Sequence, residues 1–374
     1  MKKQRIAIVH DYLREYGGAE RVLEAMHDVY PDAPVYVGFV DWKSLGIHAD
    51  RFKDWHIKET WIHRLPFYKK LYSPYRIFAP KAFASLDLSG FDVVISSSNA
   101  YFAKSVKAPN GKHICYCHTP PRALYGYSTM TDWRANPIIR IAGTILNHFL
   151  RVVDFYAAQK VDVFIANSKE TARRIEKFYR RESIVIHPPV ALADWALEHT
   201  VKLTPLAERT YFLYVNRLAL AKHPELAVQV CTELGLPLKV VGEGKMLPGL
   251  KVMAGPTVEF LGGVPDSELQ TLYAGAKALL YPVEDEDFGI VPVEAMAFGT
   301  PIIAHNSGGP RETCIDGKTG VLFDALSEEG LTAALDRCAK LNFSPKVIQN
   351  HAGSFSTDSF TRALSKLISS TISK

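Results

Sequence analysis

Residues 278–297 read ALLYPVEDEDFGIVPVEAMA, which is an apolar run, an acidic loop and a second apolar stretch that contains Pro292. An apolar run without alternation is typical of a strand that is covered on both faces of a sheet. A proline suits the first turn of a helix, where the N–H that it lacks has no partner. The stretch therefore predicts a strand that ends near Val283, a loop, and a helix that runs to about Phe298.

The same order of strand, loop and helix recurs along almost the whole chain. Helical patterns such as residues 20–29 and 169–179 separate short β-rich runs. The predicted strands are residues 6–9, 35–39, 93–97, 113–117, 163–167, 184–187, 211–215, 238–241, 258–261, 278–281, 302–304 and 319–323. This alternation predicts βαβ units and an α/β fold of doubly wound, Rossmann-like parallel sheets.

A break in the alternation divides the chain in two. Residues 188–209 contain two adjacent prolines and no clear periodicity, and 374 residues are too many for one ordinary core. We predict an N-terminal domain over residues 1–190, a linker over 191–209, a C-terminal domain over 210–350, and a final helix over 351–374 that returns to the N-terminal domain. The two domains are expected to face a central cleft, with ligands at the carboxyl ends of the strands.

Composition and charge narrow the classes of protein to consider. Hydrophobic residues make up 47% and charged residues 22%, and the net charge is +5. No basic stripe with stacking aromatic residues coincides with the predicted cleft, so nucleic-acid binding is not expected. Five cysteines, an odd and sparse set, favour a reducing compartment, so we expect a cytoplasmic protein. Cys115 and Cys117 share one face of a predicted strand and are interpreted as small buried side chains rather than metal ligands.

No export signal and no membrane span are predicted. The N-terminal residues lead directly into the first predicted strand, without an apolar stretch of signal-peptide length. The longest apolar region, residues 137–158, is interrupted by charged and polar residues, so it is not expected to cross a bilayer.

The loop in the opening stretch combines backbone amides with carboxylates. Free N–H groups at a helix N-terminus can hold phosphate. Glu286 falls in the loop and Glu294 on the helix, and ionised carboxylates accept hydrogen bonds from hydroxyls such as those of a sugar and a ribose. The residues just before or at this N-terminus are Phe288, Gly289 and Ile290.

The acidic residues of this loop allow two other interpretations. Asp285 and Asp287 could form a metal site of the Asp-x-Asp kind. The loop could also be only an acidic segment beside a helix dipole. We favour an anion site without a metal, because another loop supplies positive charge.

That other loop is residues 216–222, NRLALAK, which follow the predicted strand at 211–215. Arg217 and Lys222 can converge on one diphosphate and stabilise charge on a departing nucleotide. The plain alternative is a solvated basic loop. Its position at the carboxyl end of a strand favours a functional role.

Two loops of the N-terminal half also follow predicted strands. Residues 10–21, HDYLREYGGAER, contain Gly17 and Gly18, whose amides could approach an anion or a sugar closely; a tight turn is the alternative. Residues 118–122, HTPPR, begin with His118 at a strand's carboxyl end, where it could meet a reacting group; a structural histidine is the alternative.

Together these motifs resemble the retaining glycosyltransferases of family 4, which have the GT-B fold. The resemblance covers residues 6 to about 325. One departure is Asn216, where relatives often have glycine. The matching motifs, in the family's order, are Gly17-Gly18-Ala19-Glu20-Arg21, His118-Thr119-Pro120, Asn167-Ser168-Lys169, Arg217 with Lys222, Gly242-Glu243-Gly244, Glu286 with Glu294, and Gly308-Gly309 with Glu312.

The resemblance implies a role for each matching residue. Gly18 would lie by the donor's phosphates and sugar, and His118 would contact the transferred sugar. Arg217 and Lys222 would clamp the diphosphate, while the two glutamates would hold the sugar and the ribose. The predicted catalytic residues are His118, Glu286, Arg217 and Lys222, and the predicted donor-binding residues are Gly17, Gly18, Arg217, Lys222, Phe288, Gly289, Ile290 and Glu294, with no metal ligand and no cofactor.

A finer pattern, VHDY at 9–12 with YCHTPPR at 116–122, is similar to WbaZ-type bacterial mannosyltransferases of O-antigen and exopolysaccharide assembly. This resemblance implies GDP-mannose as the donor. The alternatives are a UDP-sugar-dependent glucosyl- or galactosyltransferase and a non-catalytic nucleotide-sugar-binding protein. Retention implies a front-face substitution in which the leaving phosphate accepts the acceptor's proton, since the sequence nominates no nucleophile for a double displacement.

Residues 61–83 have no acidic side chain and contain many aromatic and cationic residues. Such side chains suit the headgroup region of an anionic membrane, so we expect peripheral binding at the inner face of the cell membrane. The family resemblance implies a saccharide acceptor linked to a polyprenyl diphosphate. The alternative is that the aromatic rings pack inward. The cations of the segment are Arg64, Lys69, Lys70, Arg76 and Lys81.

Overall fold

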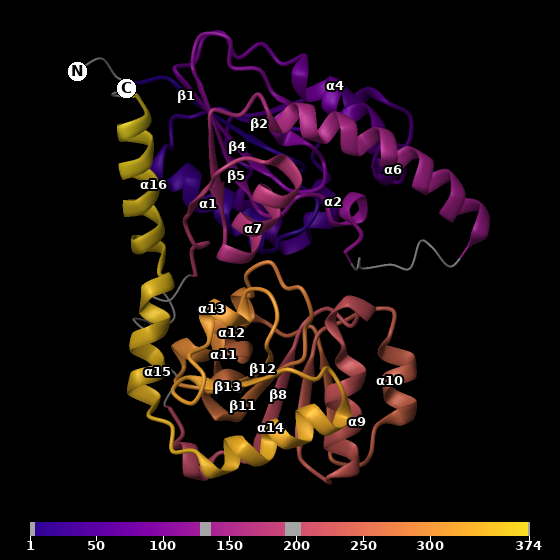
Figure 1. The fold of residues 1–374 in the computed structure, drawn as a ribbon, viewed down its shortest axis with the longest axis vertical. Helices are drawn as coiled ribbons and strands as arrows, with labels where there is room; N and C mark the ends of the chain where they lie inside the picture. The colour runs from indigo at the N-terminus through magenta and orange to yellow at the C-terminus, as the bar shows by residue number, and fades with distance from the viewer. Residues whose placement is uncertain (1–3, 128–135, 191–202, 373–374) are drawn as a thin grey trace. The chain divides into compact units, whose positions relative to one another are not determined.

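The computed structural model describes residues 4–127, 136–190 and 203–372 (Figure 1). These residues form two compact units: the first holds the chain up to Pro189 and again from Asp358, and the second holds Val190 to Thr357. The predicted linker, residues 191–209, lies outside the described residues as far as position 202. Its remainder contains one 3-10 turn, η5 (Leu206–Glu208).

A parallel sheet of seven strands forms the centre of the first unit, in the order β3-β2-β1-β4-β5-β6-β7. The chain builds outward from β1 to β3 and then restarts at β4 on the other side of β1. The carboxyl ends of β1 and β4 are therefore the switch point of the topology, where ligands bind in such sheets. The strands are β1 (Ile6–His10), β2 (Val35–Val37), β3 (Ile57–Glu59), β4 (Val93–Ser98), β5 (Lys112–Cys117), β6 (Val163–Ala166) and β7 (Ile184–Val185).

Both faces of this sheet are covered by helices, because successive residues of each strand point to opposite sides. One face packs against α1 (Gly18–Val29) and the C-terminal α16 (Thr357–Ile372), and the other against α4 (Ala79–Ala84), α6 (Pro137–Ala158) and α7 (Lys169–Tyr179). The remaining short helices are α2 (Trp42–Leu45), η1 (Gly46–Arg51), η2 (Trp61–Arg64), α3 (Tyr72–Tyr75), η3 (Arg76–Phe78), η4 (Ala103–Ser105) and α5 (Arg122–Tyr125).

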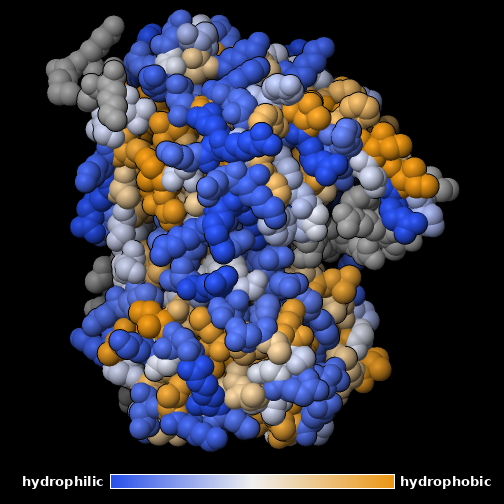
Figure 2. Space-filling view, in the orientation of Figure 1, coloured by the Kyte–Doolittle hydropathy of each residue, from blue (hydrophilic) through white to orange (hydrophobic). Residues whose placement is uncertain are grey.

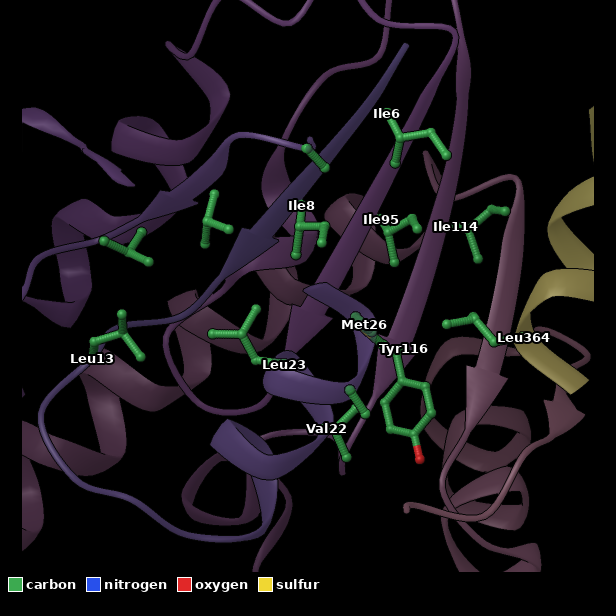
Figure 3. Packing of buried hydrophobic residues seen from close by; sticks show 14 of the residues in the cluster. Ile6, Ile8, Leu13, Val22, Leu23, Met26, Ile95, Ile114, Tyr116 and Leu364 are labelled. Carbon is green, nitrogen blue, oxygen red and sulfur yellow. The ribbon is translucent and has the colours of Figure 1, made fainter. Parts of the chain in front are cut away.

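The last helix of the chain completes the core of the first unit. Phe360, Leu364 and Ile368, on one face of α16, are buried with the apolar residues of β1, β4 and β5. Figure 3 shows Leu364 beside Tyr116 of β5. The N-terminal sheet therefore depends on residues from the far end of the chain.

A parallel sheet of six strands forms the second unit, in the order β10-β9-β8-β11-β12-β13. Its switch point lies between β8 and β11, by the same reasoning as for β1 and β4. The strands are β8 (Tyr211–Val215), β9 (Leu238–Val241), β10 (Val258–Gly262), β11 (Ala276–Tyr281), β12 (Ile302–His305) and β13 (Gly320–Phe323).

Helices cover both faces of the second sheet as well. One core forms with α11 (Asp266–Gly275), α12 (Ile290–Ala297) and α15 (Pro345–Ala352), and the other with α9 (Pro224–Glu233) and α14 (Glu328–Lys340). The remaining elements are η6 (Leu220–Lys222), α10 (Leu247–Met253), α13 (Pro310–Thr313) and η7 (Gly353–Phe355).

The two parallel sheets are predicted correctly from the sequence, but one strand is missed. β3 is three residues long, lies at the sheet edge and contains Lys58 and Glu59, so it has no apolar run to detect. The helix predicted after Val283 is confirmed as α12, which begins at Ile290 and has Pro292 in its first turn. Cys115 and Cys117 are buried free thiols in one core cluster, as predicted.

Candidate functional site

The switch point of the second unit brings together three side chains from separate loops. The Nζ atom of Lys222, in η6 after β8, lies 2.5 Å from Oε2 of Glu286, in the loop after β11. The hydroxyl of Tyr281, the last residue of β11, donates to the same oxygen at 2.8 Å. Burial, followed by the charge of Glu286, holds the pKa of Tyr281 well above its usual range, so this hydroxyl stays a neutral donor. We call these three residues the Lys222–Glu286 cluster.

Arg217 lies in the same loop as Lys222, with an exposed side chain. The loop is fixed beneath it by buried Leu218, whose N–H donates to the Glu243 carbonyl at 2.9 Å. At its other end the Tyr214 hydroxyl donates to the Lys222 carbonyl at 2.9 Å. These hydrogen bonds fix the backbone of the loop that carries the guanidinium group of Arg217 and the ammonium group of Lys222.

A glycine pair supports the Glu286 loop from the neighbouring strand. The N–H of Gly309 donates to the Glu286 carbonyl at 2.8 Å. A Cβ atom on Gly309 would lie 2.0 Å from the Phe288 carbonyl oxygen, and one on Gly308, whose φ is +62°, would lie 2.1 Å from the Glu286 carbonyl oxygen. Only glycine permits this approach. Gly308 and Gly309 are thus positioning residues for the loop, a role that the sequence motif alone does not reveal.

The N-terminus of α12 presents backbone rather than side chains. Gly289 caps the helix with φ +85°, a conformation that glycine adopts readily. The ring of Phe288 is buried against Phe355 at 5.6 Å between centroids, so this residue offers only its main chain to a ligand. Glu294 is also buried, and its Oε2 accepts from the Tyr273 hydroxyl at 3.0 Å. Of the predicted donor-binding residues, Phe288 and Gly289 directly precede α12 and Ile290 begins it, whereas Glu294 is buried within the helix.

The switch point of the first unit holds a buried chain of polar side chains. Ser97 Oγ, on β4, lies 3.0 Å from His10 Nδ1 on β1 and 2.8 Å from His118 Nε2 after β5. Oε1 of Glu20, on α1, is 3.5 Å from His10 Nε2. We call this chain the His118 relay; each of its four residues is less than a tenth exposed. A role for His118 is predicted from the sequence, whereas its contacts with Ser97, His10 and Glu20 are not.

Hydrogen-bond roles along the His118 relay follow from its carboxylate end. Glu20 favours a proton on His10 Nε2, so His10 Nδ1 accepts from the Ser97 hydroxyl. Ser97 oxygen then accepts from a proton on His118 Nε2, which leaves the lone pair of His118 on Nδ1. Burial, and then the nearby His10, lower the pKa of His118 to about 3, so its ring is neutral at physiological pH.

Backbone contacts fix the loops around the His118 relay. The Asp11 carboxylate accepts from the N–H groups of Asn99, Tyr101 and Ala103, each at 2.8 Å. Gly17 caps α1, and its N–H donates to Oε2 of Glu20 at 2.9 Å. The predicted anion contact at Gly17 would therefore compete with Glu20, whereas Gly18 is exposed.

Metal ligands do not gather in the part of the chain that the structure describes: no group of three or more His, Cys, Asp and Glu side chains there could hold an ion. Asp285 belongs to the alternative Asp-x-Asp metal site that the sequence allows. It has φ +54°, and its N–H donates to the Ser307 hydroxyl at 3.0 Å.

Comparisons with known proteins agree with this arrangement. The family described as Glycosyltransferase Family 4 matches residues 16–194, and the family described as Glycosyl transferases group 1 matches residues 198–352. The alpha-1,3/1,6-mannosyltransferase ALG2 of Candida glabrata is 24% identical over 96% of this chain and 90% of its own. The chain is a GT-B glycosyltransferase.

A second relative and a solved structure agree with the assignment of this chain to the GT-B glycosyltransferases. A GDP-Man:Man(3)GlcNAc(2)-PP-Dol alpha-1,2-mannosyltransferase of Xenopus tropicalis is 25% identical over 90% of this chain and 80% of its own. The lipopolysaccharide outer core galactosyltransferase WaaB aligns over 98% of this chain and 99% of its own, with a TM-score of 0.67 and 16% identity. At that identity, the likeness to WaaB shows the fold alone.

The relay of the glycosyltransferase can be tested with two neighbouring serines. Replacing Ser97 with alanine should lower kcat by about 10-fold or more, because His118 loses the partner that fixes its tautomer and ring. Ser96 serves as the matched control, since its hydroxyl makes a similar buried contact, 2.8 Å from His113 Nε2, outside the relay. Both variants should lose about 1–3 kcal/mol of stability, but only Ser97→Ala should lose turnover. If Ser97→Ala and Ser96→Ala have equal turnover, the His118 relay takes no part in the reaction.

Proposed function

We propose that this glycosyltransferase transfers mannose from GDP-mannose, with retention of configuration, to a saccharide on a lipid diphosphate during cell-surface polysaccharide synthesis. The observation that carries the proposal is the meeting of Lys222 and Glu286 at the switch point of the second sheet. The mannosyltransferase names of the Candida and Xenopus relatives, and the GDP-Man and PP-Dol in the second name, support the sugar, the donor and the acceptor class.

The charge distribution of the cluster suits a nucleoside diphosphate bearing a sugar. The Lys222 ammonium has three hydrogens, so it can keep Glu286 as a partner and also donate to a phosphate oxygen. Arg217 would add a second, forked donor for the same diphosphate. Glu286, which only accepts, would hold a sugar hydroxyl, while Glu294 would hold the ribose.

The reaction follows from these assignments. The bond between the sugar's anomeric carbon and the donor phosphate breaks, and the acceptor oxygen bonds to that carbon on the same face. The acceptor's proton passes to the departing phosphate, so GDP leaves. Lys222 and Arg217 stabilise the charge that develops on the phosphate. His118, with its lone pair on Nδ1, would accept a hydrogen bond from a hydroxyl of the transferred sugar.

A panel of nucleotides and nucleotide sugars tests the donor. A ligand that binds only the folded protein raises its melting temperature, and at about 100 times its Kd it adds about 2.7 kcal/mol of stability. We expect GDP and GDP-mannose to stabilise the protein more than UDP, ADP or their sugars, and GDP-mannose to be turned over. Turnover of a UDP-sugar in place of GDP-mannose would favour the alternative donor class, for example UDP-glucose or UDP-galactose.

Transfer should not require a divalent cation. In this proposal Arg217 and Lys222 supply the counter-charge that a metal ion provides in other transferases. Turnover with GDP-mannose should therefore continue in excess EDTA, measured against a sample to which magnesium or manganese is restored. If turnover is lost in EDTA and recovers when either ion is added, this expectation is wrong. Asp285 and Asp287 would then be the candidate metal ligands.

A lipid-linked acceptor would place the enzyme at the inner face of the cell membrane. None of the helices in the described part of the chain has the length and apolar character of a membrane-spanning segment. In residues 61–83, the side chains of Arg64, Lys70 and Lys81 are exposed, in keeping with the proposed contact. Arg76 departs from the sequence prediction, since its guanidinium turns inward and donates to the Asn147 side chain at 3.4 Å.

A further inference from the structure

An apolar stripe runs along the outer face of α6. Its residues recur every three or four positions, which places them on one side of a helix. They are Ile141, Ile145, Phe149, Val152, Val153 and Tyr156, with exposed fractions of 61%, 57%, 63%, 46%, 40% and 64%. Figure 2 shows apolar atoms exposed where Figure 1 places α6. We call these residues the α6 stripe.

The opposite face of α6 is already bound to its own unit. Leu150 is buried in one core cluster with Phe83, and Trp61, Tyr68 and Tyr72 of the 61–83 segment pack against the same cluster. Asn147 donates to the Ala123 carbonyl at 3.3 Å, and buried Asp154 is paired with Lys104 at 2.5 Å between Oδ1 and Nζ. The opposite face of α6 already makes the contacts that hold this helix in its own unit. The α6 stripe is therefore not needed for the core of that unit.

The exposed charged side chains of α6 itself are of one sign. The described charged side chains of α6 are Arg140, Arg151 and Asp154, of which only the two arginines are exposed. The Arg76–Asn147 hydrogen bond joins α6 to the segment that carries Arg64, Lys70 and Lys81. An exposed apolar stripe bordered by cations is the pattern of a helix that lies in a membrane interface.

A second copy of the chain suits this face less well. Two α6 stripes packed together would bring the Arg140 and Arg151 side chains of both copies to one rim, and α6 offers no exposed acidic side chain to balance them. Like charges placed close together oppose association. Anionic headgroups supply the missing opposite charge.

We propose that α6 lies flat in the headgroup region of an anionic membrane, with the α6 stripe facing the acyl chains. The inference deepens the proposed function and rests on it for the lipid-linked acceptor. The membrane contact would then consist of an inserted helix together with nearby cations, rather than of the cationic segment alone. Its affinity would depend on both the stripe and the anionic lipid.

Vesicle sedimentation tests the proposal on the full chain. Ile145→Glu combined with Phe149→Glu adds two negative charges to the α6 stripe. The matched control is Ile47→Glu with Val252→Glu, which alters two apolar side chains, 89% and 88% exposed, outside the stripe. Vesicles of phosphatidylglycerol and phosphatidylethanolamine are compared with vesicles of phosphatidylcholine.

We expect wild type and the control to sediment with the anionic vesicles, and the stripe variant to bind about 30-fold more weakly, since each charge near such a surface changes binding by about fivefold. Equal binding by the stripe variant, or no binding by wild type at low salt, would overturn the proposal. A wild-type dimer in light scattering that the stripe variant lacks, without vesicle binding, would assign the face to a second copy. The rise in melting temperature on adding GDP, measured on the same samples, tests donor binding independently of membrane binding.

Discussion

Replacing Arg217 and Lys222 together with alanine should abolish measurable transfer. Removing one preorganised donor to a developing negative charge costs an enzyme about 100- to 1,000-fold in kcat, and this change removes two. It should also remove the stabilisation by GDP, because both cations are assigned to the diphosphate. The measurement is turnover of GDP-mannose together with the melting temperature in the presence and absence of GDP.

The fold should survive the double change. Arg217 is exposed, and surface substitutions alter stability by only about 0.5 kcal/mol. Loss of Lys222 leaves Glu286 with the Tyr281 hydroxyl as a partner. The matched control is Lys251→Ala with Lys346→Ala, which removes the same net charge from exposed positions of the second unit. Near-normal turnover in the Arg217 and Lys222 variant would refute the assignment of the donor to this loop.

The strands of both sheets could be predicted closely because they are apolar runs bounded by polar loops. β8 and β9 begin and end at the predicted residues, and β5 differs by one residue at its start. These strands are buried on both faces, so their composition alone marks them. β3 could not be found in this way, because an edge strand of three residues needs no apolar run.

The contacts within each site could not be predicted, since they depend on the order of strands in the sheet. Lys222 and Glu286 are 64 positions apart and meet only because β8 and β11 are neighbours. Likewise Ser97 meets His10 because β4 pairs with β1. A polar residue at the carboxyl end of a buried strand was the available signal for Ser97. Arg76 shows the opposite case, where a cation in an exposed-looking segment turns inward.

The two clusters occupy corresponding places in the two sheets. The His118 relay lies at the β1/β4 switch point, and the Lys222–Glu286 cluster lies at the β8/β11 switch point. In the first sheet His10, the last residue of β1, meets Ser97 near the end of β4. In the second sheet Lys222, in the loop after β8, meets Glu286, in the loop after β11. The same winding rule thus produces a neutral histidine site in one unit and a charged site in the other, and the side chains decide which chemistry each can support.

Replacing Asp154 with asparagine should destabilise the first unit by about 3–5 kcal/mol, because it leaves a buried ammonium without its counter-charge. Lys104 and Asp154 are 1% and 0% exposed, and the Tyr125 hydroxyl also donates to Asp154, at 2.9 Å. Burial by itself lowers the pKa of Lys104, but the charge of Asp154 and its hydrogen bond to the lysine raise it overall above its usual value, so the lysine stays charged. Urea unfolding followed by tryptophan fluorescence measures the loss, since Trp42, Trp55 and Trp61 lie in this unit.

A double variant separates the missing counter-charge from the loss of packing. Lys104→Met with Asp154→Leu removes both charges and keeps apolar volume, so it should recover most of the stability that Asp154→Asn loses. Asp50→Asn, in the exposed pair with Lys53, is the control and should cost less than about 1 kcal/mol. If Asp154→Asn costs no more than this control, the buried pair does not hold α6 to η4 (Ala103–Ser105). In that case the α6 stripe would lack the fixed support that its proposed place in the membrane interface requires.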